Sequence, residues 1–285
     1  MNICFIADYF VYEIPGGGEL NNQEFVKIAK SRGHNVEETK SISANVGYLE
    51  SLIDYKFIVG NFVELSEKSK SFLADKTYVI YEHDHKYLEE RNPAIFKDFK
   101  APKDEIINRS FYENATAILC QSKFHKEIIE KNLGLDNIIN LSGNIWSKNI
   151  LNLIEEYSNN KKENRYAIMD SIEPHKNTRS AIKYCQHKNL KYDLIPHCKY
   201  KNFLGRLSHS ENFMFFPQTP ETLSRVVVEA RMLGMKVTTN KLVGATGEEW
   251  FKLRGKELID LMRQKRETIV DLVLEKLDEN TFSLK

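Results

Sequence analysis

The chain has 285 residues, of which 41% are hydrophobic and 28% are charged. This composition excludes a disordered or low-complexity chain and suits one large or two medium globular domains. Lys and Arg number 41 against 40 Asp and Glu, so the net charge of +1 excludes a molecule-wide field that would draw the protein onto nucleic acid or anionic lipid.

The N-terminal stretch "MNICFIADYF" lacks the basic lead and the cleavage site of a secretory signal. No apolar run approaches the roughly 18 residues that span a bilayer. The cysteines show no metal-type or redox-type spacing and predict reduced structural thiols; they are Cys4, Cys120, Cys185 and Cys198. We therefore expect no stable membrane insertion and a cytoplasmic location.

Short β-type runs alternate with segments of helical spacing through the first 145 residues. "NICFIA" leads through a glycine loop to a helix near residues 19–32, and "KFIVG" leads to "ELSEKSKSFLADK". "TYVIYEHD" precedes "KDEIINRSFYENA", "TAILCQS" precedes "KFHKEIIEKNLG", and "NIINLSG" closes the series. A repeated strand–helix pattern predicts parallel strands whose crossover helices cover the faces of a sheet.

The pattern is interrupted at about residues 143–165 by a helix-like segment and the polar run "NNKKENR". It restarts at "YAIMDS" and continues to "MKVTTN", after which charged faces and apolar positions at helical spacing predict long terminal helices. We predict an α/β chain of two doubly wound, Rossmann-like domains facing a central cleft. The predicted bounds are 1–145, 146–262 and, for a C-terminal helix with packing back on the first domain as one option, 263–285.

Open parallel sheets bind ligands at the carboxyl ends of their strands, so the loops after the strands carry the candidate site. The first, "DYFVYEIPGGGELNNQ", contains Gly16, Gly17 and Gly18, which permit positive φ and a close approach to bare backbone. The following helix offers unpaired N–H groups to an anion or sugar phosphate. A flexible hinge is the alternative interpretation.

Two further loops carry charged side chains. Lys176, in "DSIEPHKNTRS", stands just before a helix where its ammonium can neutralise a phosphate, although a lone Lys there is usually only solvated. Glu221 follows Pro217 and Pro220 at the end of a strand, beyond the predicted sheet edge.

The helix that follows Glu221 carries a second carboxylate. Ser224 is a candidate N-cap for this helix, with the backbone amides from Leu223 to Val226 facing the same space. Glu229 lies one turn after Arg225, and an i,i+4 salt bridge on a surface helix is its local explanation.

The ordered set of segments resembles the retaining, nucleotide-sugar-dependent glycosyltransferases of the GT-B fold, in the glycosyltransferase family 4-like group. "GGGELNNQEFVKIAKSRGHNVE" is similar to that family's first glycine loop, helix and strand. "PHKNTRSAI" places Lys176 where the family has a Lys that binds the donor pyrophosphate. "ETLSRVVVEARMLG" fits the signature of two Glu residues separated by seven positions, followed by Ala and Gly; its matching residues are Glu221, Glu229, Ala230 and Gly234.

The resemblance implies metal-independent transfer of a sugar, with retention, from a UDP- or GDP-linked donor to an acceptor hydroxyl, without a further cofactor. Glu221 would bind hydroxyls of the donor sugar, and Glu229 would bind the ribose. The implied donor-binding set is Gly16, Gly17, Gly18, Lys176, Thr222, Leu223, Ser224, Arg225 and Glu229. "VGATGEEW", with Gly244 and Glu248, resembles the loop that closes over the nucleotide.

In similar enzymes a His or Asp after the strand corresponding to "TYVI" sits beside the anomeric carbon. His83, Asp84 and His85 are therefore candidates for orienting or deprotonating the acceptor hydroxyl. With Glu221, His83 and Asp84 form the predicted catalytic set. A metal site is the less favoured interpretation, because neighbouring residues of a strand point in different directions.

The chain departs from the family in two places. Thr222, Leu223 and Ser224 replace a Gly-Phe-Gly turn, and the region of Met169 and Asp170 lacks a Gly-Arg pair. The second phosphate cation is therefore missing or replaced. Arg225 is the expected substitute, with Arg179 and Arg206 as alternatives.

Several functions stay open at this point. The acceptor is a glycan, a small molecule or a hydroxymethylated DNA base, although the neutral net charge predicts only modest phosphate affinity. The missing Arg and the altered turn fit a non-catalytic nucleotide-sugar-binding protein. A dehydrogenase is disfavoured because no dinucleotide glycine fingerprint follows a first strand. Oligomeric state is not indicated.

Overall fold

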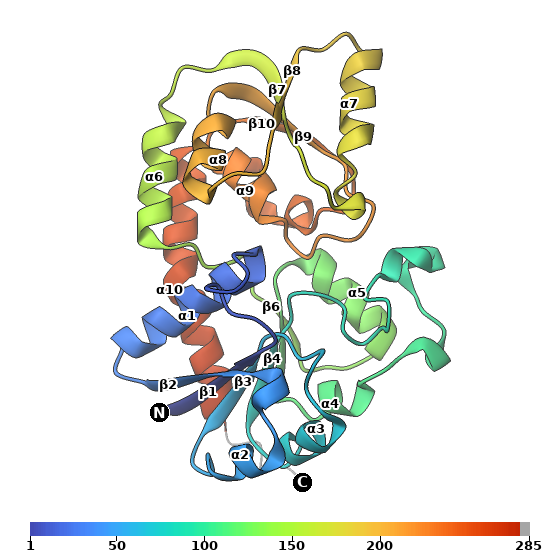
Figure 1. Cartoon of the computed structure of the whole chain (residues 1–285), viewed down its shortest axis with the longest axis vertical. Helices are drawn as coiled ribbons and strands as arrows, with labels where there is room; N and C mark the ends of the chain where they lie inside the picture. Colours follow the sequence, from blue (N-terminus) through green and yellow to red (C-terminus); the bar gives the residue numbers. More distant parts are fainter. Residues whose placement is uncertain (280–285) are drawn as a thin grey trace. The chain divides into compact units, whose positions relative to one another are not determined.

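The computed structural model describes residues 1–279. The chain divides into two compact units (Figure 1): unit 1 comprises Met1–Ile145 and the segment that begins at Lys265, and unit 2 comprises Trp146–Gln264. Residues 280–285, the end of the predicted C-terminal helix, lie outside the described residues. The functional roles predicted for the domains stay predictions.

Unit 1 is built on a parallel sheet in the order β2-β1-β3-β4-β5-β6 (Figure 1). Its strands are β1 (Asn2–Ala7), β2 (Asn35–Lys40), β3 (Lys56–Val59), β4 (Tyr78–Tyr81), β5 (Ala117–Cys120) and β6 (Ile138–Asn140). Strands β4 and β5 are buried along their whole length. Such continuous apolar strands are expected where helices cover both faces of a sheet.

Each face of this sheet has its own core, because alternate side chains of a strand point to opposite faces. Ile3 and Phe5 of β1 pack with α1 (Gly17–Ser31) and the C-terminal turns of α10 (Lys256–Asp278). Cys4 and Ile6 pack in the core of the opposite face. The helices of that face are α2 (Val46–Glu50), α3 (Glu67–Leu73), α4 (Arg109–Glu113) and α5 (Lys123–Leu133).

Short 3-10 turns complete unit 1, and most of them lie between β4 and α4. They are η1 (Ser41–Ser43), η2 (Pro93–Ile95), η3 (Lys97–Phe99) and η4 (Lys103–Glu105). The connection after β4 is therefore long and irregular, and it carries the predicted acceptor residues.

Unit 2 has a smaller parallel sheet in the order β10-β9-β7-β8. Its strands are β7 (Glu163–Met169), β8 (Tyr192–Ile195), β9 (Ser210–Phe215) and β10 (Lys236–Thr239). The helices α6 (Lys148–Ser158), α8 (Tyr200–Leu207) and α9 (Arg225–Met232) share one core with the first turns of α10, whereas α7 (Thr178–His187) packs in the other. The 3-10 turns are η5 (Pro174–Lys176), η6 (Gly244–Gly247) and η7 (Glu249–Lys252).

The predicted α/β class with parallel sheets is confirmed. The strand–helix series omitted β2, α2 and α8. In β2, "NVEETK" is an edge strand with a polar, alternating pattern rather than an apolar run. In place of long terminal helices the chain has η7 and one helix, α10, which begins after Gly255 at φ +58°.

Within residues 1–279, no helix combines the length and the hydropathy needed to cross a membrane. Cys4, Cys120 and Cys185 are buried free thiols, and Cys198 is a partly exposed one. The prediction of structural thiols holds for the three that lie in the cores.

Candidate functional site

In unit 2, two loops from adjacent strands bring Lys176 and Glu221 together. Lys176 ends η5, after β7, and Glu221 lies in the turn after β9. Lys176 Nζ donates to Glu221 Oε1 at 2.7 Å, although the residues are 45 positions apart. The two side chains are 27% and 14% exposed, so the pair is partly open to solvent.

The loop after β10 holds the turn of Glu221 in place. Glu221 N donates to Leu242 O and Gly244 N donates to Glu221 O, both at 2.8 Å. Ala245 N donates to Leu223 O at 3.0 Å. The predicted loop "VGATGEEW" therefore contacts the predicted donor turn through its backbone.

Ser224 occupies the N-cap position of α9, but its hydroxyl does not cap the helix. The residue has φ 72°, in the left-handed region, and its side chain makes no cap hydrogen bond. Its Oγ is buried and has no hydrogen-bond partner among the described residues. A left-handed conformation is costly for a residue with a Cβ and natural for the Gly that the family has at this turn. The predicted side-chain cap is thus wrong for this helix.

Glu229 lies in a buried polar cluster. Its Oε1 accepts from Trp146 Nε1 at 2.9 Å and from Tyr200 OH at 2.5 Å, and it lies 3.8 Å from Arg225 Nε. The Arg225 guanidinium lies 4.3 Å from the centroid of a Trp146 ring. The i,i+4 ion pair is present, but Glu229 is only 3% exposed, so the helix face is not a surface face.

The cluster fixes the protonation state of Tyr200. Burial, with the nearby Glu229 carboxylate, raises the pKa of Tyr200, so its phenol stays protonated and donates. Sequence reasoning missed Trp146 and Tyr200, which lie 83 and 29 positions from Glu229 and form no motif with it. The ribose-binding role of Glu229 stays a prediction.

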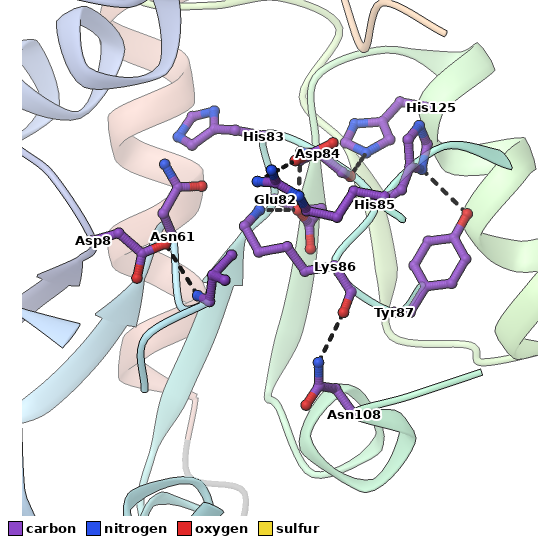
Figure 2. Close-up of polar contacts among 12 residues, drawn as sticks. Asp8, Asn61, Glu82, His83, Asp84, His85, Lys86, Tyr87, Asn108 and His125 are labelled. Atoms are coloured by element: carbon purple, nitrogen blue, oxygen red, sulfur yellow. Dashed lines mark hydrogen bonds and ion pairs between the residues drawn. The ribbon is translucent and has the colours of Figure 1, made fainter. Parts of the chain in front are cut away.

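In unit 1, the turn after β4 carries His83 and Asp84, and the buried carboxylate of Glu82 holds this turn (Figure 2). Glu82 is fully buried. Its Oε1 accepts from Lys86 Nζ at 2.5 Å and from Asp84 N at 2.9 Å, and its Oε2 accepts from Tyr112 OH. These bonds fix the backbone of the turn.

His83 is held through both ring nitrogens. Its Nε2 lies 2.6 Å from Asn22 Oδ1, and its Nδ1 is bonded to the side-chain amide of Gln121. With Asn22 Oδ1 as the acceptor, Nε2 is the donor of this pair. The ring also stacks on Tyr81, with centroids 5.0 Å apart.

The glycine loop meets His83 at the start of α1. A Cβ added to Gly18 would lie 3.4 Å from the His83 ring. The three glycines Gly16–Gly18 are absent from the positive-φ residues, and Gly16 has φ −80°. The expectation of positive φ is therefore wrong here, and a Cβ at Gly18 would make an ordinary van der Waals contact with the His83 ring.

A second histidine contacts the backbone of the turn (Figure 2). His125 Nε2 bonds to Asp84 O at 2.9 Å, and His125 Nδ1 accepts from Gln121 N at 3.3 Å. Burial lowers the pKa of His125 to about 3, so the ring is neutral. The Asp84 carboxylate lies 3.3 Å from Arg91 NH1 and is about one-third exposed.

His85, the third residue in the predicted "HDH" series, belongs to the core. It is buried between His125 and Tyr87, with both rings in edge-on contact. Burial lowers its pKa well below the usual value. His85 is thus not placed to meet an acceptor hydroxyl, because neighbouring positions in this segment face opposite ways.

Asp8, at the end of β1, was missed by sequence reasoning. The side chain is buried and accepts from Val63 N at 3.0 Å, from Glu64 N at 3.1 Å and from the hydroxyl of Ser41. It anchors the loop after β3 to the end of β1. An acidic residue directly after a buried strand was the available signal.

The remaining predicted cations lie on three helices of unit 2. Arg179 on α7 and Arg206 on α8 are exposed, and Arg225 stands with Glu229. Over residues 1–279, no group of three or more His, Cys, Asp or Glu side chains is arranged to hold a metal ion.

No protein-family model and no curated protein sequence matches the chain. Solved structures do match it. Anabaena HepE, in complex with UDP and glucose, matches over 97% of this chain and 91% of its own, with 14% identity and a TM-score of 0.54. The fold is GT-B.

Two further structures give the same result. The UDP-forming alpha,alpha-trehalose-phosphate synthase of Burkholderia vietnamiensis matches over 97% of this chain and 93% of its own, with 8% identity and a TM-score of 0.57. AviGT4, a glycosyltransferase involved in avilamycin A biosynthesis, covers 97% of both chains at 10% identity and a TM-score of 0.54. The fold predicted from the resemblance is confirmed, and at these identities the likeness concerns the fold alone.

Proposed function

We propose that the protein is a glycosyltransferase that moves a sugar from a UDP- or GDP-linked donor to an acceptor hydroxyl, with retention and without a metal ion. Unit 2 binds the donor and unit 1 binds the acceptor. The observation that carries the proposal is the Lys176–Glu221 pair at the carboxyl edge of the second sheet, beside the start of α9, in a chain of GT-B fold.

Lys176 and the start of α9 are suited to a diphosphate. An ammonium and the unpaired N–H groups of a helix N-terminus both attract phosphate oxygens. The buried, unpartnered Ser224 Oγ adds a hydroxyl donor at the same turn. When Lys176 turns to a phosphate, Glu221 loses its present partner and becomes available to accept hydrogen bonds from donor-sugar hydroxyls.

The charge that develops on the leaving diphosphate is stabilised by fixed groups. Lys176 and the dipole of α9 supply positive potential without a divalent ion. Arg225 is the second cation of the proposed site, and Glu229 and Trp146 hold its guanidinium in place. The signature that runs from Glu221 to Glu229 supports retention.

On unit 1, Asp84 is the proposed group that takes the proton of the acceptor hydroxyl, because its carboxylate is partly exposed. His83 orients the acceptor through contact with its ring, which Asn22 and Gln121 hold in one position through its two nitrogens. The start of α1, with Gly16–Gly18, lies beside His83 and forms part of the proposed acceptor site. Buried free thiols are typical of a reducing compartment, which supports the cytoplasmic location that we propose.

The first test is binding of UDP, GDP, UDP-glucose and GDP-mannose, measured by calorimetry. Lys176→Met should weaken a nucleoside diphosphate about tenfold or more, because a charge-assisted phosphate contact is lost, and should leave the nucleoside little changed. Lys188→Met, an exposed lysine next to α7, is the matched control. Equal loss for nucleoside and nucleoside diphosphate would reject the phosphate role.

The second test separates an enzyme from a binding protein. Release of nucleoside diphosphate from the bound nucleotide sugar, with water or an added acceptor, supports transfer. Tight binding with no release under any condition would establish the non-catalytic alternative, and no binding at all would overturn the proposal.

A further inference from the structure

A cavity of about 660 Å³ opens in unit 1, between α3 and the long connection after β4. This volume is within the range of about 300–1,000 Å³ that is usual for small-molecule sites. Its lining includes Phe62, Val63, Lys70, Lys86, Arg91 and Asn108. None of the donor residues of unit 2 takes part in it.

Each cation of the lining has a carboxylate partner. Lys70 Nζ donates to Glu67 Oε1 and to Asn108 Oδ1, both at 2.7 Å. Lys86 Nζ donates to the buried Glu82 at 2.5 Å, and Arg91 lies 3.3 Å from Asp84. The cavity therefore offers donors and acceptors in balance rather than an excess of positive charge.

Val63 and Ile107 supply the accessible apolar surface of the cavity, because Phe62 and Leu88 are only 1% and 2% exposed. The buried Phe62 ring lies beneath the ammonium groups of Lys70 and Lys86, which are 5.8 and 5.5 Å from its centroid. A ligand that fits must present an apolar face to Val63 and Ile107 and hydroxyl groups to the charged side chains.

Two contacts connect the cavity to the turn that carries Asp84. Arg91 binds the Asp84 carboxylate directly. Lys86 binds Glu82, which accepts from the Asp84 amide, as Figure 2 shows. Val63, which is 58% exposed, lies on the lining and is fixed through its amide to Asp8. A group bound in the cavity is thus adjacent to the proposed acceptor residues.

We propose that this cavity binds the acceptor, and that the acceptor is an uncharged saccharide. The inference rests on the proposed function. A sugar ring has an apolar C–H face and hydroxyls that both donate and accept, so it matches paired cations and carboxylates beside the aliphatic side chains of Val63 and Ile107. A DNA backbone would instead require cations free to neutralise phosphates, and here each cation already faces an acid.

The test is saturation-transfer NMR with glucose, galactose, mannose, N-acetylglucosamine and maltose as probes, and with a short single-stranded DNA as the competing class. At least one saccharide should receive saturation transfer from wild-type protein. Val63→Trp places a large ring at the cavity and should reduce this transfer at least fivefold. Ile53→Trp, at another exposed aliphatic residue of unit 1, is the matched control and should leave it unchanged.

Donor binding, measured in the same variants by calorimetry, distinguishes a failure of the proposed cavity from a failure of the proposed glycosyltransferase function. Unchanged UDP or GDP affinity in Val63→Trp, together with lost saccharide binding, supports the cavity. Donor binding without any saccharide binding, saccharide binding that Val63→Trp does not alter, or binding of DNA that Val63→Trp abolishes would each overturn the inference. Absence of donor binding in the wild type would overturn the proposed function instead.

Discussion

Ser224 shows how a single residue departs from the Gly-Phe-Gly turn of the family that the sequence resembles. At φ 72° its Cβ is in a region that glycine occupies freely, and its buried hydroxyl makes no hydrogen bond within the described chain. Backbone strain of this kind is estimated at about 1–3 kcal/mol and is found mainly at functional sites. The turn therefore carries a stability cost that a ligand bound to the hydroxyl would offset.

Ser224→Gly should stabilise the free protein by about 1 kcal/mol. The substitution removes the backbone strain and the cost of a buried hydroxyl without a hydrogen bond. Together these gains exceed the conformational entropy that glycine adds to the unfolded chain. Chemical denaturation monitored by tryptophan fluorescence reports on this unit, because Trp146 and Trp250 both belong to it. Ser180→Gly, inside α7, is the control and should destabilise. An unchanged or lower midpoint for Ser224→Gly would show that the turn is not strained.

The contacts of Glu229 decide which effect its substitution has on donor binding and on stability. Glu229→Gln removes the charge that faces Arg225 but keeps an oxygen for Trp146 and Tyr200. We expect weaker donor binding, by about three- to thirtyfold, with little loss of stability, because Arg225 loses the carboxylate that positions it. Calorimetry together with thermal unfolding measures both effects, and donor affinity within twofold of wild type would remove Glu229 from the site.

At the scale of the element, the turn after β4 depends on buried neutral histidines. His125 donates to Asp84 O, and burial lowers its pKa to about 3 and that of His85 well below the usual value. Neither ring takes up a proton in the folded state near neutral pH. The unfolded chain does so below its ordinary value of about 6.5.

Stability should therefore fall as the pH is lowered from about 6.5 toward 3, since the unfolded state then binds more protons than the folded state. The urea midpoint, followed by circular dichroism between pH 7.5 and 5.0, measures this slope. His125→Gln should flatten it, and the exposed His209→Gln should not. An equal slope in both variants would assign the acid sensitivity to other groups.

The same scale shows what the sequence could predict. Apolar runs such as "AILC" and "YVIY" indicated buried parallel strands, because continuous burial leaves a plain compositional signal. The resemblance assigned Lys176 and Glu221 to one donor site, but the ion pair between them was not predicted. Trp146 and Tyr200 could not be connected to Glu229, because a tertiary contact over this separation leaves no local pattern. Likewise, the polar alternation of β2 concealed an edge strand.

At the scale of the whole molecule, unit 1 is completed by residues from both ends of the sequence. Ile269, Val270, Val273 and Leu277 of α10 pack in the core that contains Phe5 and Phe25. Arg32 adds contacts to Glu267 at 2.9 Å and to Asp271 at 2.7 Å, and Arg266 lies 3.4 Å from Glu24. The last turns of α10 therefore belong to the first unit's core.

A chain ending at residue 264 should lose solubility and cooperative unfolding of unit 1, because an apolar face of its sheet becomes exposed. Removal of 280–285 alone is the control and should leave both intact. The soluble fraction and hydrogen exchange of β1 and β4 measure the effect. Full protection of those strands in the shortened chain would show that α10 is dispensable for this core.

This arrangement also sets an order of events during translation. Trp146–Gln264 is continuous, so it has all of its own residues as soon as it leaves the ribosome, whereas Met1–Ile145 waits for the segment that begins at Lys265. While residues 146–264 are being synthesised, the earlier segment presents an unfinished apolar surface. The nascent polypeptide is therefore expected to engage chaperones through residues 1–145 until α10 has been made.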